Sequence, residues 1–307
     1  MSSPGKLFYT GRAPEVYVAS MSARATALFR PDRLRLGITY TLSLGEFVLE
    51  LMYPFTIGLA IDGFLGGRGF TSIIPLAAVW GAQSAVGALY QISASRTVAR
   101  IYCRVCGDLV LQGDRTPDAT SEVAARVNMV EKVCEALSDV VPMLLSAFVT
   151  IAGSTIMLFL FDVRAGLVAL SLILIIGLLQ WWFSVHALDL NAKINTLRES
   201  QVTVLRATGA TRVRDYLRAL TRLNVRFKDL ETGVWTIADV FALLAIAVVL
   251  YLVAGAGAYN AGAIYAMVTY IMSLTDSLES APVLVDEAAH FSDVVSRVAS
   301  GAGSLES

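Results

Sequence analysis

The sequence predicts an all-α membrane protein with six transmembrane helices, and three observations support this prediction. Apolar residues make up 56% of the 307 residues and the mean hydropathy is +0.64, both above the values of soluble domains. Six segments reach the ~20 residues that a bilayer core requires. They are residues 36–61, 71–93, 140–161, 165–186, 234–257 and 262–283. Finally, 22 of the 24 Lys and Arg residues fall on one side of these segments.

This charge asymmetry sets the expected topology. The basic side holds both chain ends and the connections 94–139 and 187–233, whereas the other side holds only Arg68 and Arg164. Loops rich in Lys and Arg stay in the cytoplasm, so we expect a multi-pass protein of the inner (cytoplasmic) membrane with both termini cytoplasmic. Residues 1–35 are then a cytoplasmic or interfacial segment, in which 16–30 have the composition of a short amphipathic helix.

The connections between the spans alternate in length. The outer ones are short: 62–70, 161–164 and 254–261. The inner connections are long and carry apolar residues at helical spacing, with turn-forming residues only near 113–117 and 208–211. We therefore expect spans 2–3 and 4–5 to continue into the cytoplasm as two long helical hairpins, each extending roughly 30 Å beyond the membrane.

Five short stretches match, in order, motifs of one known family: 53–62, 121–126, 161–167, 206–210 and 296–298. They resemble the transmembrane domain of exporter-type ABC transporters. The first resembles the P-x-x-x-G-x-x-I-D ending of that family's span 1, and the third its D-W-R-L-A-L turn between spans 3 and 4. The resemblance covers about residues 30–300, and it implies an exporter-like six-helix domain at 36–298 with a short tail at 299–307.

The resemblance also implies partners. The family builds its pathway from two six-span units, so we expect a homodimer in the lipid bilayer. Its ATPase domain follows span 6, but these 307 residues contain no Walker A motif. The one Gly-Lys pair, Gly5-Lys6, is followed by Leu7 rather than Ser or Thr. We therefore expect a chain that is not an enzyme and needs no cofactor. The alternative is a separate ATPase subunit.

Five carboxylates lie in or near the apolar spans, which contain no Lys or Arg: Glu46, Glu50, Asp239, Asp276 and Glu279. A charge at mid-membrane costs about 2.5–3.5 kcal/mol, so such residues normally face a bundle interior or water. Glu46 and Glu50 are spaced to share one helical face, near the midplane of span 1. We interpret them as a proton or cation site of a pathway. The alternative is that they form hydrogen bonds between helices and fix packing.

Span 6 carries a second polar stripe on one helical face: Thr269, Ser273, Asp276, Glu279, Asp286, His290 and Asp293. Asp276 and Glu279 are candidates for the same pathway. The lower half of the stripe is expected to be a solvated face, on which His290 is a candidate pH-sensitive group. Asp239 stands near the predicted start of span 5, so a helix-start or interfacial role competes with a role in the pathway.

Three cysteines and two histidines offer little for other chemistry. Cys103 and Cys106 form a C-x-x-C pair, but a metal or redox site needs further ligands, and we expect buried apolar cysteines and no metal. The net charge of −1 gives no reason to expect nucleic-acid binding.

Three functions remain open on the sequence alone. The first is a proton-coupled transporter of a cationic or amphiphilic solute, such as a polyamine, a drug or a basic peptide. The second is the membrane subunit of a two-component ABC transporter. The third is a membrane protein that binds or regulates a partner without transporting a solute.

Overall fold

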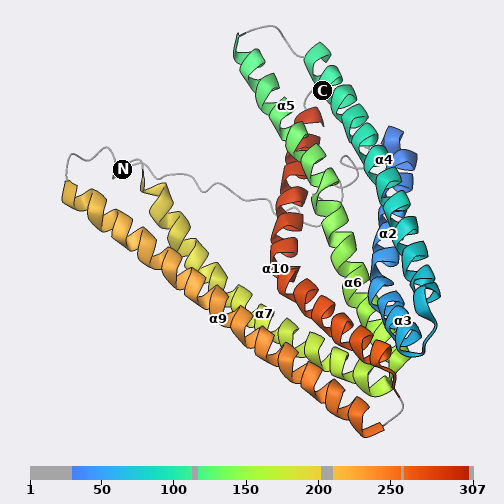
Figure 1. Cartoon of the computed structure of the whole chain (residues 1–307). Helices are drawn as coiled ribbons and strands as arrows, with labels where there is room; N and C mark the ends of the chain where they lie inside the picture. Colours follow the sequence, from blue (N-terminus) through green and yellow to red (C-terminus); the bar gives the residue numbers. More distant parts are fainter. Residues whose placement is uncertain (1–29, 113–116, 202–209, 257–258, 304–307) are drawn as a thin grey trace, which may run out of the picture. The chain divides into compact units, whose positions relative to one another are not determined.

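The computed structural model describes residues 30–112, 117–201, 210–256 and 259–303 (Figure 1). These residues form helices and contain no strand. The helices are η1 Arg30–Asp32, α2 Arg33–Leu51, α3 Tyr53–Leu65, η2 Gly69–Ile73, α4 Ile74–Gln112, α5 Pro117–Ser138, α6 Val140–Phe161, α7 Val163–Glu199, α9 Ala210–Ala256 and α10 Ala261–Gly303. The predicted amphipathic helix at 16–30 lies almost wholly outside the described residues.

Within the described residues, five helical stretches are long and apolar enough to cross a membrane: Arg30–Leu65, Gly69–Asp108, Val127–Phe161, Val163–Glu199 and Thr211–Val253. The chain is therefore an all-α membrane protein. The sixth predicted span lies in α10, which does not reach the same hydropathy because its polar stripe interrupts the apolar sequence.

Four helices continue far past the predicted spans, and one of them is α10, which extends from span 6 to Gly303. α4 extends from span 2 to Gln112, α7 extends from span 4 to Glu199, and α9 begins at Ala210, well before span 5. Figure 1 shows α7 and α9 side by side along their length. The predicted turns of the two inner hairpins fall mostly outside the described residues.

The first predicted span is broken, which the sequence reading missed. α2 ends at Leu51 and α3 begins at Tyr53, with Pro54 in the first turn of α3. Proline has no N–H to donate to the carbonyl four residues earlier, and its ring clashes with the preceding turn. Span 1 is therefore two helices joined at Met52.

A second break separates α5 from α6 at Asp139, and it again precedes a proline, Pro142. The amide of Asp139 still bonds to the carbonyl of Glu135 at 3.0 Å. The chain thus stays nearly helical through the break, and the predicted start of span 3 at residue 140 coincides with the start of α6.

The described residues divide into two compact units, one drawn from the residues up to 43, from 87–143 and from 286 onward, and the other drawn from 44–86 and 144–285. In the first unit, Ile101 and Val105 of α4 pack against Val130 and Cys134 of α5. An ion pair between Arg104 and Asp32, 2.7 Å long, adds to this unit.

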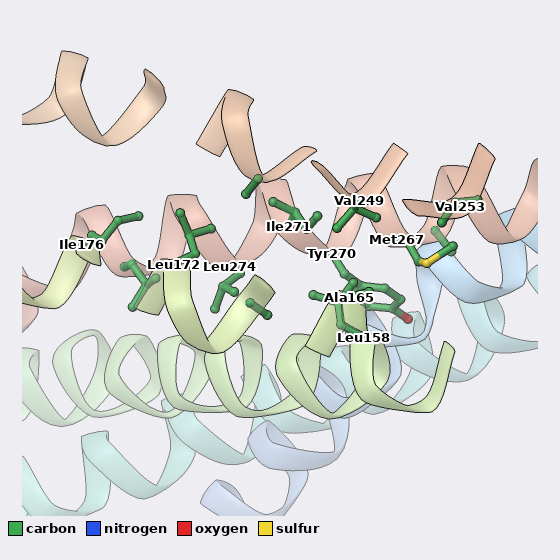
Figure 2. Close-up of a cluster of buried hydrophobic side chains, with 14 of the residues drawn as sticks. Leu158, Ala165, Leu172, Ile176, Val249, Val253, Met267, Tyr270, Ile271 and Leu274 are labelled. Atoms are coloured by element: carbon green, nitrogen blue, oxygen red, sulfur yellow. The ribbon is translucent and has the colours of Figure 1, made fainter. Parts of the chain in front are cut away.

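The core of the second unit gathers small and branched side chains from α6, α7, α9 and α10 (Figure 2). Tyr270 is its largest fully buried side chain, and Leu158, Leu172 and Met267 are also buried completely or nearly so. Alanines on the facing helices, such as Ala169 and Ala238, allow the close packing that membrane helices depend on.

Candidate transport pathway

Glu46 and Glu50 lie on α2 directly before the break at Met52. Glu46 is half-buried and Glu50 is exposed, and the charges of both act on the hydroxyl of Tyr53 beyond the break. That hydroxyl donates to Oε1 of Gln83 on α4 at 2.9 Å. The bond between Tyr53 and Gln83 joins α3 to α4 on the far side of the break from the two carboxylates.

Thr39 and Ser43 lie on the same polar face of span 1 as Glu46 and Glu50, but they are not exposed to solvent. Thr39 is 3% exposed and shares a hydrogen bond of 2.7 Å with Ser93 of α4, and Ser43 is completely buried. Thr39 therefore joins α2 to α4, whereas Glu46 further along α2 is half-buried and Glu50 is exposed. The polar spacing alone could not distinguish the two parts.

Asp239 on α9 and Asp276 and Glu279 on α10 belong to the second unit. Glu279 lies close enough to both aspartates for their charges to act on its own. Asp239 and Asp276 are exposed, and Glu279 is half-buried with one oxygen that has no hydrogen-bond partner among the described residues. The structure thus brings together three of the predicted acids from two helices.

The helix-start role considered for Asp239 is wrong. α9 begins at Ala210, so Asp239 lies well inside a continuous helix. The predicted start of span 5 marks where the apolar part of this helix begins, and the interfacial role of Asp239 stays a prediction. For His290, the structure describes the backbone in α10 but not the side chain.

The cysteines do not assemble a site. Cys134 is buried in the core of the first unit, Cys106 is half-buried, and Cys103 is exposed. Across the described part of the chain, no group of three His, Cys, Asp or Glu residues is arranged to hold a metal ion.

Two aspartates that the sequence reading did not single out as site residues form hydrogen bonds at the predicted outer end of the spans. Asp62 at the end of α3 accepts a hydrogen bond of 2.8 Å from the amide of Gly262, in the first turn of α10. Asp162 caps α7 by accepting from the amide of Arg164, and it accepts from the hydroxyl of Tyr259, both at 2.6 Å. Asp162 could be expected as an N-cap from its place directly before an apolar run. The partner of Asp62, 200 residues away, has no local signal.

These bonds change the ionisation of Asp162. The hydroxyl of Tyr259, and next the amide of Arg164, lower the pKa of this carboxyl, because both stabilise its charged form. A carboxyl whose pKa is lower in the folded state contributes stability above its ordinary pKa and loses it as the pH falls through the folded value.

We therefore expect Asp162→Ala to lower the thermal midpoint in detergent by about 2–4 °C at neutral pH, the size expected for loss of an N-cap. The difference from wild type should shrink as the pH falls below about 4. Asp189→Ala is the matched control, because Asp189 forms only an exposed ion pair with Lys193 and its loss should change little. A pH-independent difference would show that Asp162 does not act through its charge.

Comparison with known families agrees with this architecture. A family model described as the ABC transporter transmembrane region matches residues 27–263. The chain belongs to this family. The family region includes Glu46, Glu50 and Asp239, whereas Asp276 and Glu279 lie beyond its end. No curated protein matches the chain. This ABC transporter transmembrane region is a transporter-type membrane domain, and the resemblance expected from the short motifs is confirmed.

Proposed function

We propose that the chain is a proton-coupled transporter that moves a cationic or amphiphilic solute as a homodimer. The observation that carries this proposal is the placement of the acids. Glu50, Asp239 and Asp276 are exposed in a single chain, on helices of a membrane domain. The ion pairs among the described residues involve none of them.

An exposed carboxylate inside a span cannot face lipid without a large cost in free energy. Water or another polar surface must therefore meet it. A second copy of the chain that encloses a water-filled space supplies such a surface. This argument supports a homodimer of two six-span domains, each comprising 36–298, with α10 as the sixth span, the hairpins of spans 2–3 and 4–5 in the cytoplasm, and both termini on that side.

The carboxylates can couple two fluxes. Glu46 and Glu50 are close in sequence and on one face, so both cannot readily be ionised in an apolar environment. A cationic solute that binds the pair takes the place of the proton that one carboxylate holds, so the net charge of the site is unchanged, and the proton returns when the solute departs. Asp276 and Glu279, with Asp239, are placed to extend the same exchange along the pathway.

Uptake into proteoliposomes tests this function. Purified protein is reconstituted, a pH gradient is imposed without nucleotide, and uptake of radiolabelled spermidine and tetraphenylphosphonium is followed. We expect uptake of at least one of these cations that depends on the gradient and stops when a protonophore collapses it. Uptake equal to that of protein-free liposomes for both cations would contradict the proposed solute class.

Membership of the ABC transporter transmembrane region family favours a second candidate, the membrane subunit of a transporter whose ATPase is a separate polypeptide. This candidate predicts that an ATPase co-purifies from native membranes in mild detergent, as identified by mass spectrometry, and that transport requires ATP. Uptake driven by a pH gradient in the purified protein without ATP would exclude it.

A further inference from the structure

Both proline breaks in the spans receive a tyrosine hydroxyl from another helix. At the break between α2 and α3, Tyr270 of α10 donates to the carbonyl of Leu51 at 2.9 Å. At the break between α5 and α6, Tyr40 of α2 donates to the carbonyl of Leu137 at 3.0 Å. At each break, one backbone carbonyl therefore accepts its hydrogen bond from a side chain of another helix.

The hydroxyl of Tyr270 occupies the place of a missing backbone bond. In an unbroken helix the carbonyl of Leu51 would accept from the amide of Phe55. Instead, the hydroxyl of Tyr270 donates to that carbonyl. Helix kinks have such causes, a proline or a group inserted into the ladder of backbone bonds, and both are present here.

We propose that the hydroxyl of Tyr270 is a latch on a hinge at Met52. With the latch closed, α2 and α3 keep the angle seen in the structure. When Tyr270 withdraws, the carbonyl of Leu51 loses its partner and the two helices change their angle. Tyr270 is completely buried, so water does not readily replace it while α10 stays in place.

The latch connects the helices that carry the candidate acids. Glu50 directly precedes Leu51, and Tyr53 and its partner Gln83 lie on the other side of the break. Asp276 follows Tyr270 on α10. A change of angle at the hinge therefore moves Glu50 relative to Tyr53 whenever α10 shifts. The hinge stands on its own contacts and does not depend on the proposed transport function.

Hydrogen–deuterium exchange on the full chain in detergent tests the latch. Tyr270→Phe removes only the hydroxyl, and we expect the amides of residues 52, 53 and 55–57 to exchange about tenfold faster. Pro54→Ala supplies an amide that can donate to the carbonyl of Glu50, and it removes the ring that opposes a continuous helix, so the amide of Phe55 can bond to the carbonyl of Leu51 directly. In that background Tyr270→Phe should have no further effect on these amides. Tyr265→Phe, which alters a more exposed tyrosine on the same helix, is the control.

An equal effect of Tyr270→Phe in both backgrounds, or none in either, would overturn the latch. If Tyr270→Phe alone does not fold, recovery of the folded protein by Pro54→Ala supports the proposal, and failure to recover it overturns it. Neither result depends on transport, so failure here is distinguishable from failure of the proposed function.

Spin-label distances test whether the break is a hinge. Leu44 and Leu65 are exposed on either side of it and can carry nitroxide labels after the three native cysteines are changed to serine. We expect Tyr270→Phe to broaden or shift the distance between the labels, and Pro54→Ala to narrow its distribution. An unchanged distance in Tyr270→Phe would show a local hydrogen bond without a hinge, which would overturn the proposal.

Discussion

Replacing both Glu46 and Glu50 by Gln should reduce uptake driven by a pH gradient at least tenfold, to the level of protein-free liposomes. Glutamine keeps the size of the side chain but can neither release a proton nor neutralise a cation. Folding should not suffer, because glutamine carries no charge, and a charge inside a span costs about 2.5–3.5 kcal/mol. The thermal midpoint in detergent should therefore stay the same or rise.

Glu131→Gln with Glu135→Gln is the matched control for this pair. These two glutamates have the same spacing on α5 and are exposed, but they precede the predicted span 140–161. We expect this control to retain uptake. If Glu46 and Glu50 only fix packing, their double variant would instead lower the thermal midpoint and leave uptake intact, and the proton-site assignment would be wrong.

Gly262→Ala should lower the thermal midpoint more than any other small substitution on α10. A Cβ at Gly262 would overlap the backbone carbonyl of Gly58, and it would lie 2.8 Å from the carboxyl carbon of Asp62. Backbone atoms cannot rotate away as a side chain can, so α3 and α10 would have to separate. Such overpacking costs about 1–3 kcal/mol, or roughly 2–10 °C for a chain of this size.

Gly81→Ala is the control for this substitution. A Cβ at Gly81 would have no heavy atom within 4 Å, so only the helix propensity changes. Alanine is favoured over glycine inside a helix by about 0.5–1 kcal/mol. The two glycine variants should therefore move the thermal midpoint in opposite directions. A midpoint unchanged by Gly262→Ala would show that α3 and α10 do not approach so closely in the membrane.

The membrane character of the chain and the limits of α6 could be predicted from hydropathy alone. Residues 140–161 are predominantly apolar, contain no charged residue and are flanked by the charged Asp139 and Asp162, so both ends are marked. The full lengths of α4, α7 and α9 needed helical periodicity as well, because these helices leave the apolar part of their sequence. Asp239 lies near the start of the apolar part of α9 but far from the start of the helix.

The break in span 1 carried a local signal that hydropathy hides. Pro54 stands in an apolar segment, and a proline inside a helical pattern ends or kinks the helix at the preceding residues. The tyrosine hydroxyl that bonds to the carbonyl of Leu51 at this break has no such signal in the local sequence. Tyr270 lies 219 residues from Leu51, and only the packing of α10 against α2 brings them together.

The candidate acids could likewise be predicted only in part from the sequence. Five carboxylates without a basic partner in their spans could be recognised from residue types and positions. The sequence could not show that Asp239 lies near Glu279, because this depends on how α9 and α10 pack. It also could not show that Thr39 and Ser43 are buried, while Glu50 on the same helix is exposed.

The most direct test of the central claim is the movement of protons themselves. Proteoliposomes holding a pH-sensitive dye are given a cationic solute that the protein takes up, with no initial pH gradient and no nucleotide. The account predicts that the lumen becomes more alkaline as the solute enters and protons leave. It also predicts that the Glu46→Gln, Glu50→Gln variant shows no such change. Solute uptake without any change in lumenal pH would contradict it.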